Sequence, residues 1–284
     1  MGEGAGRSGR ADPEHADAVS RIANSLADAD TAVAFTGAGV STASGVPSFR
    51  GDDGVWNAEY DPADFRIERF RADPVGFWKD RLELHETMYG VDAARAEGDG
   101  HAGDAEARDA HAVAPNAAHD ALATLEDAGV LTAVVTQNVD GLHAAAGTDS
   151  LLEIHGNARR STCVDCGATT PTDAVRERVR DGETPPRCDC GGLLKPDVVL
   201  FGERLPPVFD EARRLAREAD AFLAAGSSLT VEPAASLPVT AARDGDLHVV
   251  NFDETPHDDI AATATRADVT DVLPAVAARV LSHR

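Results

Sequence analysis

Short apolar runs alternate with helical segments along this chain, and that alternation is the feature that most constrains its fold. The runs cover residues 31–35, 129–135, 221–225 and 247–250, and each has the length of a buried strand. Strand–loop–helix alternation of this kind produces a parallel sheet that is covered by helices on both faces. We therefore predict an α/β fold with a doubly wound parallel sheet.

The helices are predicted from apolar residues that recur at helical spacing, such as Ala18, Ile22 and Leu26 in the first of them. The chain has 284 residues, which is enough for one large domain or for one domain with a smaller insertion. The predicted helices cover residues 16–28, 116–127, 173–180, 207–218, 234–244 and 272–281.

The loop after the second apolar run carries an unusual number of polar groups. It presents an amide pair, Gln137 and Asn138, and a carboxylate, Asp140. Two imidazoles follow, His143 at the end of the loop and His155 a little later. Ligands of open α/β sheets bind where loops leave the carboxyl ends of the strands. This loop is therefore the first candidate for a functional site.

The loop after the first apolar run is rich in glycine. Glycines after a strand allow the backbone to approach a ligand closely and leave amide N–H groups for a phosphate. Gly37 and Gly39 fit the dinucleotide fingerprint, but Thr42 stands where its third glycine would be, so an ordinary tight turn is the alternative. Phe49 and Arg50 favour a ligand, since an arginine beside an aromatic ring could clamp a phosphate or stack on a ring.

Two further predicted strands also end in small or polar residues. The third apolar run leads into the Gly/Ser loop at residues 226–233, and the fourth leads into the polar segment at 251–253. This repetition favours an extended nucleotide that lies along one edge of the sheet.

All four cysteines, Cys163, Cys166, Cys188 and Cys190, fall within one short region. A disulfide scaffold would spread its cysteines, whereas two pairs at this separation are typical of a tetrahedral zinc ribbon. The second pair has one intervening residue, so its turn is tighter than usual. Four thiolates would complete the coordination of zinc, and the metal is therefore expected to be structural.

The chain is strongly acidic, with a formal net charge of −23 and a sequence pI of about 4.6. Acids are spread along the whole chain, and lysine occurs only at Lys79 and Lys195. We interpret this as a surface adapted to high salt, where self-repulsion is screened; a basic partner is the alternative. The charge also argues against direct binding of nucleic acid.

Two segments lack the pattern of a folded element. Residues 1–15 are Gly-rich and charged, without the apolar core of a secretory signal, and are expected to form a disordered tail. Residues 91–112 have no apolar face and are expected to form an exposed insertion, with solvated histidines. No apolar run approaches the length that spans a bilayer, so we expect no membrane association and a cytoplasmic location.

These motifs, in this order, resemble those of the sirtuins, the NAD-dependent protein-lysine deacylases. The resemblance covers about residues 16–282. The segments that carry it are Gly37–Arg50 (GAGVSTASGVPSFR), Thr136–His143 (TQNVDGLH), His155–Gly156, the four cysteines, Lys195–Glu203 (KPDVVLFGE), Gly226–Leu229 (GSSL) and Asn251.

The resemblance implies a Rossmann-like domain and a smaller domain built from a helical and a zinc-bearing insertion. NAD+ and an acyl-lysine peptide would enter the cleft between them from opposite sides. The implied division is an NAD-binding domain at 16–50, 115–157 and 196–284, a helical insertion and cofactor loop at 51–114, and a zinc module at 158–195.

The resemblance also assigns roles to individual residues. It implies NAD+ as co-substrate, structural Zn2+, and acyl-lysine proteins as substrates; it leaves the oligomeric state open, with a monomer favoured. His155 would be the catalytic base, assisted by Asn138 and Asp140, whereas His143 would only hold the loop. The substrate would contact Val198, Phe201, Gly202 and Glu203. NAD+ would contact Gly37, Ala38, Gly39, Ser41, Pro47, Phe49, Arg50, Gln137, Asn138, Asp140, Gly226, Ser227, Ser228, Asn251 and Asp253.

The acyl group is less strongly indicated. Sirtuins that prefer succinyl or malonyl groups carry a tyrosine and an arginine three residues apart, and here Trp78 and Arg81 occupy those positions. An arginine could pair with an acyl carboxylate, but with the tyrosine absent we interpret Arg81 as a solvated helix charge. We therefore expect a deacetylase. The alternatives are a desuccinylase or demalonylase that uses Arg81, a protein ADP-ribosyltransferase on the same fold, and a non-catalytic NAD-binding module.

Overall fold

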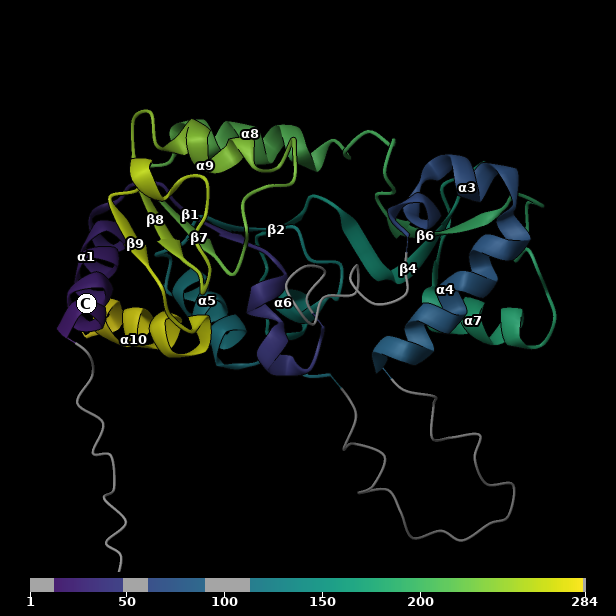
Figure 1. Cartoon of the computed structure of the whole chain (residues 1–284), viewed down its shortest axis with the longest axis horizontal. Coiled ribbons are helices and arrows are strands. Elements are labelled where there is room, and N and C mark those ends of the chain that lie inside the picture. The colour runs from purple at the N-terminus through teal and green to yellow at the C-terminus, as the bar shows by residue number, and fades with distance from the viewer. Residues whose placement is uncertain (1–12, 48–60, 90–112, 283–284) are drawn as a thin grey trace, which may run out of the picture.

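The computed structural model describes residues 13–47, 61–89 and 113–282, and its larger part is built on a six-stranded parallel sheet (Figure 1). The strand order is β3-β2-β1-β7-β8-β9, and neighbouring strands in this sheet are parallel. The strands are β1 (Ala32–Thr36), β2 (Ala133–Thr136), β3 (Leu151–Glu153), β7 (Ala221–Ala225), β8 (Asp246–Val250) and β9 (Thr263–Thr265).

Helices cover both faces of this sheet, as the alternation predicted. One face carries α1 (Pro13–Asp28), α5 (Ala117–Asp127) and α10 (Val269–Leu281), and the other carries α8 (Val208–Glu218) and α9 (Ser236–Ala241) (Figure 1). The predicted doubly wound α/β fold is therefore confirmed.

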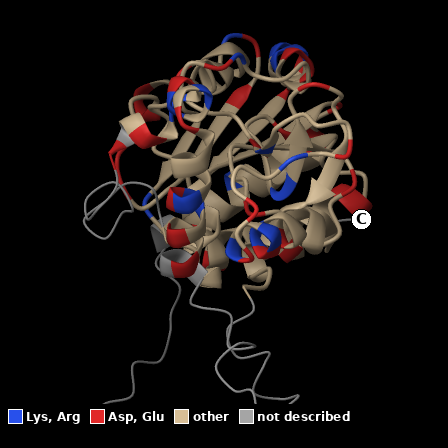
Figure 2. Cartoon of the chain, turned by 90° about the vertical axis from the view of Figure 1, so that its right-hand side faces the viewer, with Lys and Arg blue, Asp and Glu red and all other residues tan. Residues whose placement is uncertain are grey.

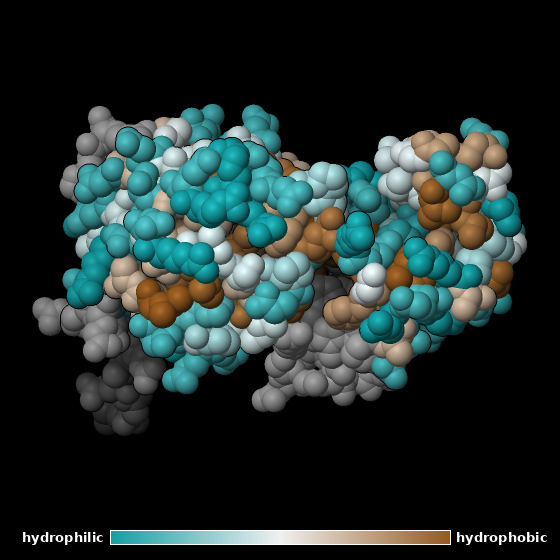
Figure 3. Space-filling model, turned by 90° about the horizontal axis from the view of Figure 1, so that it is seen from above, coloured by the Kyte–Doolittle hydropathy of each residue, from teal (hydrophilic) through white to brown (hydrophobic). Residues whose placement is uncertain are grey.

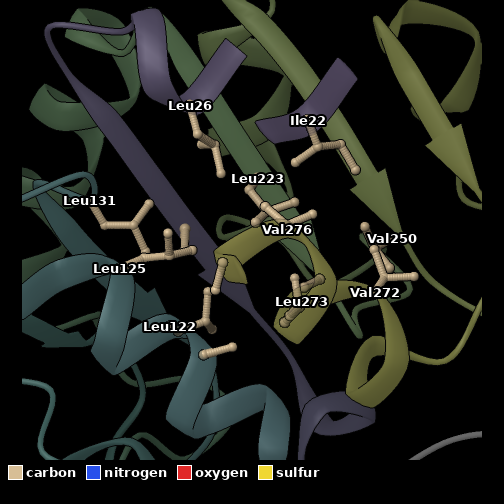
Figure 4. Packing of buried hydrophobic residues seen from close by; sticks show 14 of the residues in the cluster. Ile22, Leu26, Leu122, Leu125, Leu131, Leu223, Val250, Val272, Leu273 and Val276 are labelled. Atoms are coloured by element: carbon tan, nitrogen blue, oxygen red, sulfur yellow. The ribbon is translucent and has the colours of Figure 1, made fainter. Parts of the chain in front are cut away.

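The central strand β1 is buried along its whole length, which explains why its sequence is apolar from Ala32 to Phe35. Its side chains still alternate between two cores. Ala32 and Ala34 pack with the cluster beneath α1, α5 and α10, whereas Val33 and Phe35 pack with the cluster beneath α8 and α9. Figure 4 shows the first cluster, in which side chains from helices and strands meet, among them Ile22, Leu122, Leu223 and Leu273.

The smaller part of the molecule combines the two insertions. An antiparallel sheet has the order β5-β4-β6, and Trp78 ties it to the helical insertion because its Nε1 donates to the Leu194 carbonyl at 2.8 Å. Figure 3 shows the two parts as separate lobes joined by a narrower region. The elements of the small lobe are η3 (Pro62–Phe65), α3 (Ile67–Ala72), α4 (Pro74–Tyr89), β4 (Gly156–Cys163), β5 (Thr169–Pro171), α7 (Thr172–Arg180) and β6 (Leu194–Val198).

Several boundaries differ from those expected from the sequence. The edge strands β3 and β9 have three residues each and were not predicted, since so short a run shows no clear period. Helix α9 is shorter than the predicted 234–244, and α10 begins at Val269 because the Asp268 carboxylate accepts from the Thr270 N–H. Strand β6 crosses the boundary expected at 195/196, since it pairs with β4.

Some expectations lie outside the described residues. These include most of the predicted tail at 1–15, all of the predicted insertion at 91–112, and the residues Phe49 and Arg50. Among the helices that the structure describes, none is both long and apolar enough to cross a membrane. The remaining short helices are η1 (Ala38–Val40), η2 (Thr42–Ser44), α6 (Leu142–Ala145) and η5 (Asp258–Ile260).

The glycines after β1 and β7 pack against each other. The N–H of Gly39 donates to the carbonyl of Gly226 at 2.8 Å, and the N–H of Gly37 donates to that of Ala225 at 3.2 Å. A Cβ on Gly226 would lie 2.7 Å from the carbonyl carbon of Gly39 and would also strike the Val40 nitrogen, and Gly226 has φ +59°. These glycines therefore allow two backbones to touch.

This contact predicts the effect of adding one methyl group. Gly226→Ala should lower the free energy of unfolding by about 2 kcal/mol or more, because it adds a backbone clash to the cost of a positive φ. Gly129→Ala is the matched control: Gly129 has φ +66° and no heavy atom within 4 Å of the new Cβ, so its cost should be about 1 kcal/mol. Denaturant unfolding at fixed salt measures both, and equal losses would contradict the clash.

Candidate functional site

The carboxyl ends of four neighbouring strands, β2, β1, β7 and β8, are linked by backbone hydrogen bonds. The N–H of Gln137 donates to the Thr36 carbonyl at 3.0 Å, and the N–H of Gly226 donates to the Val250 carbonyl at 2.9 Å. The glycines after β1 and β7 make further contacts. Together, these bonds bring the polar loops that follow β1, β2, β7 and β8 to the carboxyl-end edge of the sheet. Parallel sheets bind ligands at this edge.

Buried hydroxyls and an imidazole support the base of the site. Thr36 Oγ1 donates to Thr136 Oγ1 at 2.8 Å and lies 2.9 Å from His143 Nε2. His143 is 1% exposed, and burial followed by the neighbouring His119 ring lowers its pKa to about 3. A neutral, enclosed imidazole of this kind fits the holding role that the sequence suggested for His143.

The Ser41 hydroxyl connects the loop after β1 to the loop after β2. Its hydroxyl donates to the Asp140 carboxylate at 2.7 Å and accepts from the Asn138 amide at 3.0 Å. Asn138 also donates to the Gly37 carbonyl at 3.1 Å, while Asp140 accepts from the Leu142 N–H at 2.8 Å. The two polar side chains after β2 are thus held in single orientations.

His119 is a member of this network that the sequence reasoning missed. It is fully buried, its Nε2 lies 3.4 Å from Ser41 Oγ, and its Nδ1 accepts from the Asn116 N–H at 3.3 Å. Because Nδ1 accepts, Nε2 carries the proton and points its N–H at Ser41. Burial lowers the pKa of His119, against a smaller opposing effect from Asp140. The detectable signal was an Asn-x-x-His pair at the start of a helix, which forms a capping box.

His155 has the tautomer of a base. Its Nδ1 lies 3.1 Å from the Gln137 carbonyl, which can only accept, so Nδ1 carries the proton and Nε2 carries the lone pair. Burial lowers the pKa of His155 below its ordinary value, and the bond to Gln137 opposes that shift. Within the described ranges Nε2 has no hydrogen-bond partner. A neutral imidazole with an open nitrogen can accept a proton.

Gln137 and Ser227 bridge the loops after β2 and β7. The Gln137 side-chain amide donates to Ser227 Oγ at 2.8 Å, and Ser227 Oγ also accepts from the Leu229 N–H at 3.3 Å. Ser227 is 8% exposed. Both side chains therefore hold the loops together, which the sequence did not indicate.

In the glycine loops after β1 and β7, some backbone N–H groups donate to carbonyls of the protein and others do not. The N–H of Gly37 donates to Ala225 at the end of β7, and the N–H of Gly39 donates to Gly226 in the loop after it, so these two amides are engaged within the protein. The N–H groups of Ala38, Ser227 and Ser228 have no partner in the part of the chain that the structure describes. These three amides could hold a phosphate at the strand edge. Pro47 is the last described residue of the loop after β1.

The last cofactor candidates lie after β8. The Asn251 side chain donates to the Asp253 carbonyl at 2.9 Å, and its backbone N–H donates to Thr265 at 3.1 Å. Asp253 is exposed, and Phe252 between them is 66% exposed. This segment therefore extends the same strand edge and presents an open carboxylate.

The candidate substrate residues lie in a loop that follows β6 and is bonded to His155. The N–H of Val199 donates to the His155 carbonyl at 2.9 Å. Phe201 is 43% exposed, and Gly202 has φ +90°. The Glu203 carboxylate points back into its own loop, where it accepts from the Leu200 N–H at 2.8 Å and from Lys195 at 3.0 Å. Glu203 thus shapes the loop, and its expected contact with the peptide stays a prediction.

The interpretation of Arg81 as a solvated charge is wrong. Its guanidinium lies 3.6 Å from the centre of the Phe65 ring and 5.1 Å from that of Phe77, and it donates to the Asp64 carbonyl at 3.3 Å. Trp78, at the other position of the acyl-selecting pair, is 1% exposed inside the small lobe. Arg81 therefore packs within the helical insertion, and Trp78 packs between that insertion and the small sheet.

The four cysteines converge at one end of the small sheet. Cys163 and Cys190 have sulfurs 3.5 Å apart, those of Cys166 and Cys188 are 3.7 Å apart, and all four lie within 4.8 Å of one another. A tetrahedral zinc with bonds of about 2.3 Å requires sulfur separations of roughly 3.8 Å, so the set fits zinc. Backbone N–H groups donate to Cys163 from two following residues, first of all Cys166, and lower the pKa of its thiol to about 7.

The chain matches known proteins over most of its length. The model of the Sir2 family matches residues 62–233. An NAD-dependent protein deacetylase of Haloarcula marismortui is 54% identical over 267 residues, which cover 93% of this chain and 95% of that relative.

Solved Sir2 structures share the fold. One, with a p53 peptide and NAD+, is 34% identical with a TM-score of 0.73, and the match covers 93% of this chain and 97% of that one. Another, with a deacetylated p53 peptide and 3'-O-acetyl-ADP-ribose, is 33% identical with a TM-score of 0.77 and coverages of 92% and 98%. The alternating strands and helices, the linked strand edge and these matches together establish that the chain belongs to the Sir2 family.

Proposed function

We propose that this protein removes acetyl groups from protein lysines with NAD+ as co-substrate, giving nicotinamide, O-acetyl-ADP-ribose and free lysine. The observation that carries the proposal is His155, which is held by Gln137 with its Nε2 lone pair open beside the linked loops. The Haloarcula relative, an NAD-dependent protein deacetylase, and the ligands bound in the two Sir2 structures support the same reaction.

The arrangement of unused polar groups supports a place for NAD+. The amides of Ala38, Ser227 and Ser228 would hold phosphates, and Asn251 and Asp253 would receive the adenosine ribose. The nicotinamide side would contact the remaining expected residues of the first two loops, Ser41, Pro47, Phe49, Arg50, Gln137, Asn138 and Asp140.

Asn138 and Asp140 are suited to hold a carboxamide and a ribose. Both hydrogens of the Asn138 amide nitrogen are engaged, by Gly37 and Ser41, so its oxygen is left as an oriented acceptor. Asp140 is fixed by Ser41 and Leu142 and retains further lone pairs. Preorganised acceptors of this kind lower the cost of orienting a substrate.

NAD+ supplies an anomeric carbon from which the acyl oxygen can displace nicotinamide. A ribose hydroxyl must afterwards lose its proton to attack the activated acyl carbon. A water molecule must then add to that carbon so that its bond to the lysine nitrogen breaks, which releases free lysine and leaves the acetyl group on the ribose. His155 Nε2 would accept that proton, and the resulting imidazolium would remain bonded to the Gln137 carbonyl through Nδ1. The loop at Val198, Phe201 and Gly202 would hold the acyl-lysine peptide.

We also propose that zinc is structural, that the protein works in the cytoplasm and that its acidic surface is an adaptation to high salt. Four thiolates leave no open coordination position, and a reducing compartment preserves them. The chain carries 49 acidic and 26 basic residues, and Figure 2 shows acids on many of its helices.

The first test removes the open nitrogen of His155. In His155→Asn the side-chain amide can still donate to the Gln137 carbonyl, so the fold should persist while deacetylation falls by about 10²–10⁴-fold. Exchange of labelled nicotinamide, which precedes the proton transfer, should continue on an acetyl-lysine peptide.

His257→Gln is a matched control because His257 Nε2 contacts the Ala235 carbonyl, which a glutamine amide can also reach. This control should retain full turnover, measured by mass spectrometry of the peptide and of O-acetyl-ADP-ribose. Near wild-type deacetylation by His155→Asn would remove His155 from the base role.

The pH profile gives a second test. Burial lowers the pKa of His155 from 6.5, and the base acts in its neutral form, so activity should be lost only as pH falls through the lowered value. The acid limb of kcat/KM for the acetyl-lysine peptide is therefore expected below pH 6.5. A limb above pH 6.5, with the circular dichroism spectrum unchanged over that range, would contradict this assignment.

Removal of one thiolate tests the metal. Cys163→Ser should release zinc, measured by plasma emission spectrometry, and should lower the free energy of unfolding by about 3 kcal/mol or more, since metal binding is coupled to folding. A strong zinc chelator should have the same effect on the wild-type chain. A variant with unchanged zinc content and melting temperature would refute the zinc site.

A further inference from the structure

We propose that Lys195 is a positioning residue for the acyl-lysine peptide: its ammonium closes the 198–203 loop and thereby sets the edge that the substrate contacts. This inference rests on the proposed deacetylase function. It assigns a role to a side chain that neither the zinc site nor the base includes.

The contacts of Lys195 join the two ends of the loop. Its Nζ donates to the Val198 carbonyl at 2.7 Å and to the Glu203 carboxylate at 3.0 Å. The same Glu203 oxygen accepts from the Leu200 N–H at 2.8 Å. One ammonium and one carboxylate thus satisfy a carbonyl and an amide inside the turn. The side chains of Lys195 and Glu203 are only 14% and 23% exposed, so water screens the pair weakly.

Other bonds fix where this closed loop lies. The Val199 N–H donates to the His155 carbonyl at 2.9 Å, and Phe201 pairs with the helical insertion through Phe65 at 2.9 Å and Ile67 at 3.0 Å. The loop is therefore attached to the candidate base on one side and to the small lobe on the other. Loss of the Lys195–Glu203 ion pair would therefore change the shape of the 198–203 loop while the hydrogen bonds to His155, Phe65 and Ile67 remain.

The loop retains groups that an extended peptide could use. Over the described residues, the Val199 carbonyl and the Gly202 N–H have no hydrogen-bond partner, and the Phe201 side chain is 43% exposed. A peptide that adds as a strand needs an acceptor and a donor of this kind at defined separations. Lys195 and Glu203 set that separation because they hold the residues on either side.

The choice of lysine at this position also supports the inference. The chain uses arginine for 24 of its 26 basic residues and keeps lysine only at Lys79 and Lys195. An ammonium is a compact donor with three N–H groups, whereas a guanidinium is a larger planar fork. Inside a turn that places a carbonyl and a carboxylate around one nitrogen, the compact donor fits and the fork requires the turn to open.

The test compares peptide and nucleotide binding in Lys195→Met. We expect KM for an acetyl-lysine peptide to rise tenfold or more, while Kd for ADP-ribose, measured by calorimetry, changes less than twofold. Lys79→Met is the matched control, since it removes the other lysine, which is exposed on α4 beside an open groove lined by Leu82 and Val179. Its KM should equal that of the wild type. An unchanged peptide KM in Lys195→Met overturns the proposal.

A second variant covers the case in which Lys195→Met does not fold, because that change leaves a carboxylate without its cation. Lys195→Met combined with Glu203→Gln removes both charges and keeps an acceptor for Leu200. It should fold and still show the raised peptide KM, and a normal KM would contradict the role of the pair. Lys195→Arg keeps the charge but requires the turn to open, so its peptide KM should lie above that of the wild type; a wild-type KM in Lys195→Arg would contradict the requirement for a compact donor.

Wild-type turnover separates this inference from the proposed function. A wild-type chain that does not deacetylate the peptide with NAD+ overturns both. A wild-type chain that does so, together with an unchanged KM in Lys195→Met, overturns only the role of Lys195.

Discussion

The end of β1 is the junction on which the rest of the site depends. The Thr36 carbonyl receives the Gln137 N–H, and the Thr36 hydroxyl contacts Thr136 and His143. These are buried polar groups, and each must find a partner because an unpaired one would cost about 1–3 kcal/mol. Their mutual satisfaction fixes the start of the loop after β2, and through it the carbonyl that selects the tautomer of His155.

Backbone contacts also fix the glycine loops after β1 and its other neighbouring strand, β7. The loops after β1 and β7 touch through backbone atoms, which only glycine permits at Gly226 with its φ of +59°. The contact uses the amides of Gly37 and Gly39 and leaves those of Ala38, Ser227 and Ser228. The packing of these two loops thus determines which amides are left for the phosphate site that we propose.

Much of the large lobe could be predicted, because its strands are buried on both faces and therefore read as unbroken apolar runs. The strand at Ala221–Ala225 was predicted with its observed limits. The two edge strands were missed, since edges mix exposed and buried positions over three residues. The cysteine cluster was also predictable, because few structures other than a metal site require four cysteines in one short segment. The roles of His155, Asn138 and Asp140 stay predictions.

By itself the sequence determined the fold class, the family resemblance and the set of chemical groups, since periodicity and motif order are local properties of the chain. Only the tertiary structure decided how those groups are used. It brought His119 to Ser41 across 78 positions, turned Glu203 inward to Lys195, and placed Arg81 over Phe65. Each of these outcomes depends on which elements pack together, and the partner of a side chain is set only when the chain has folded.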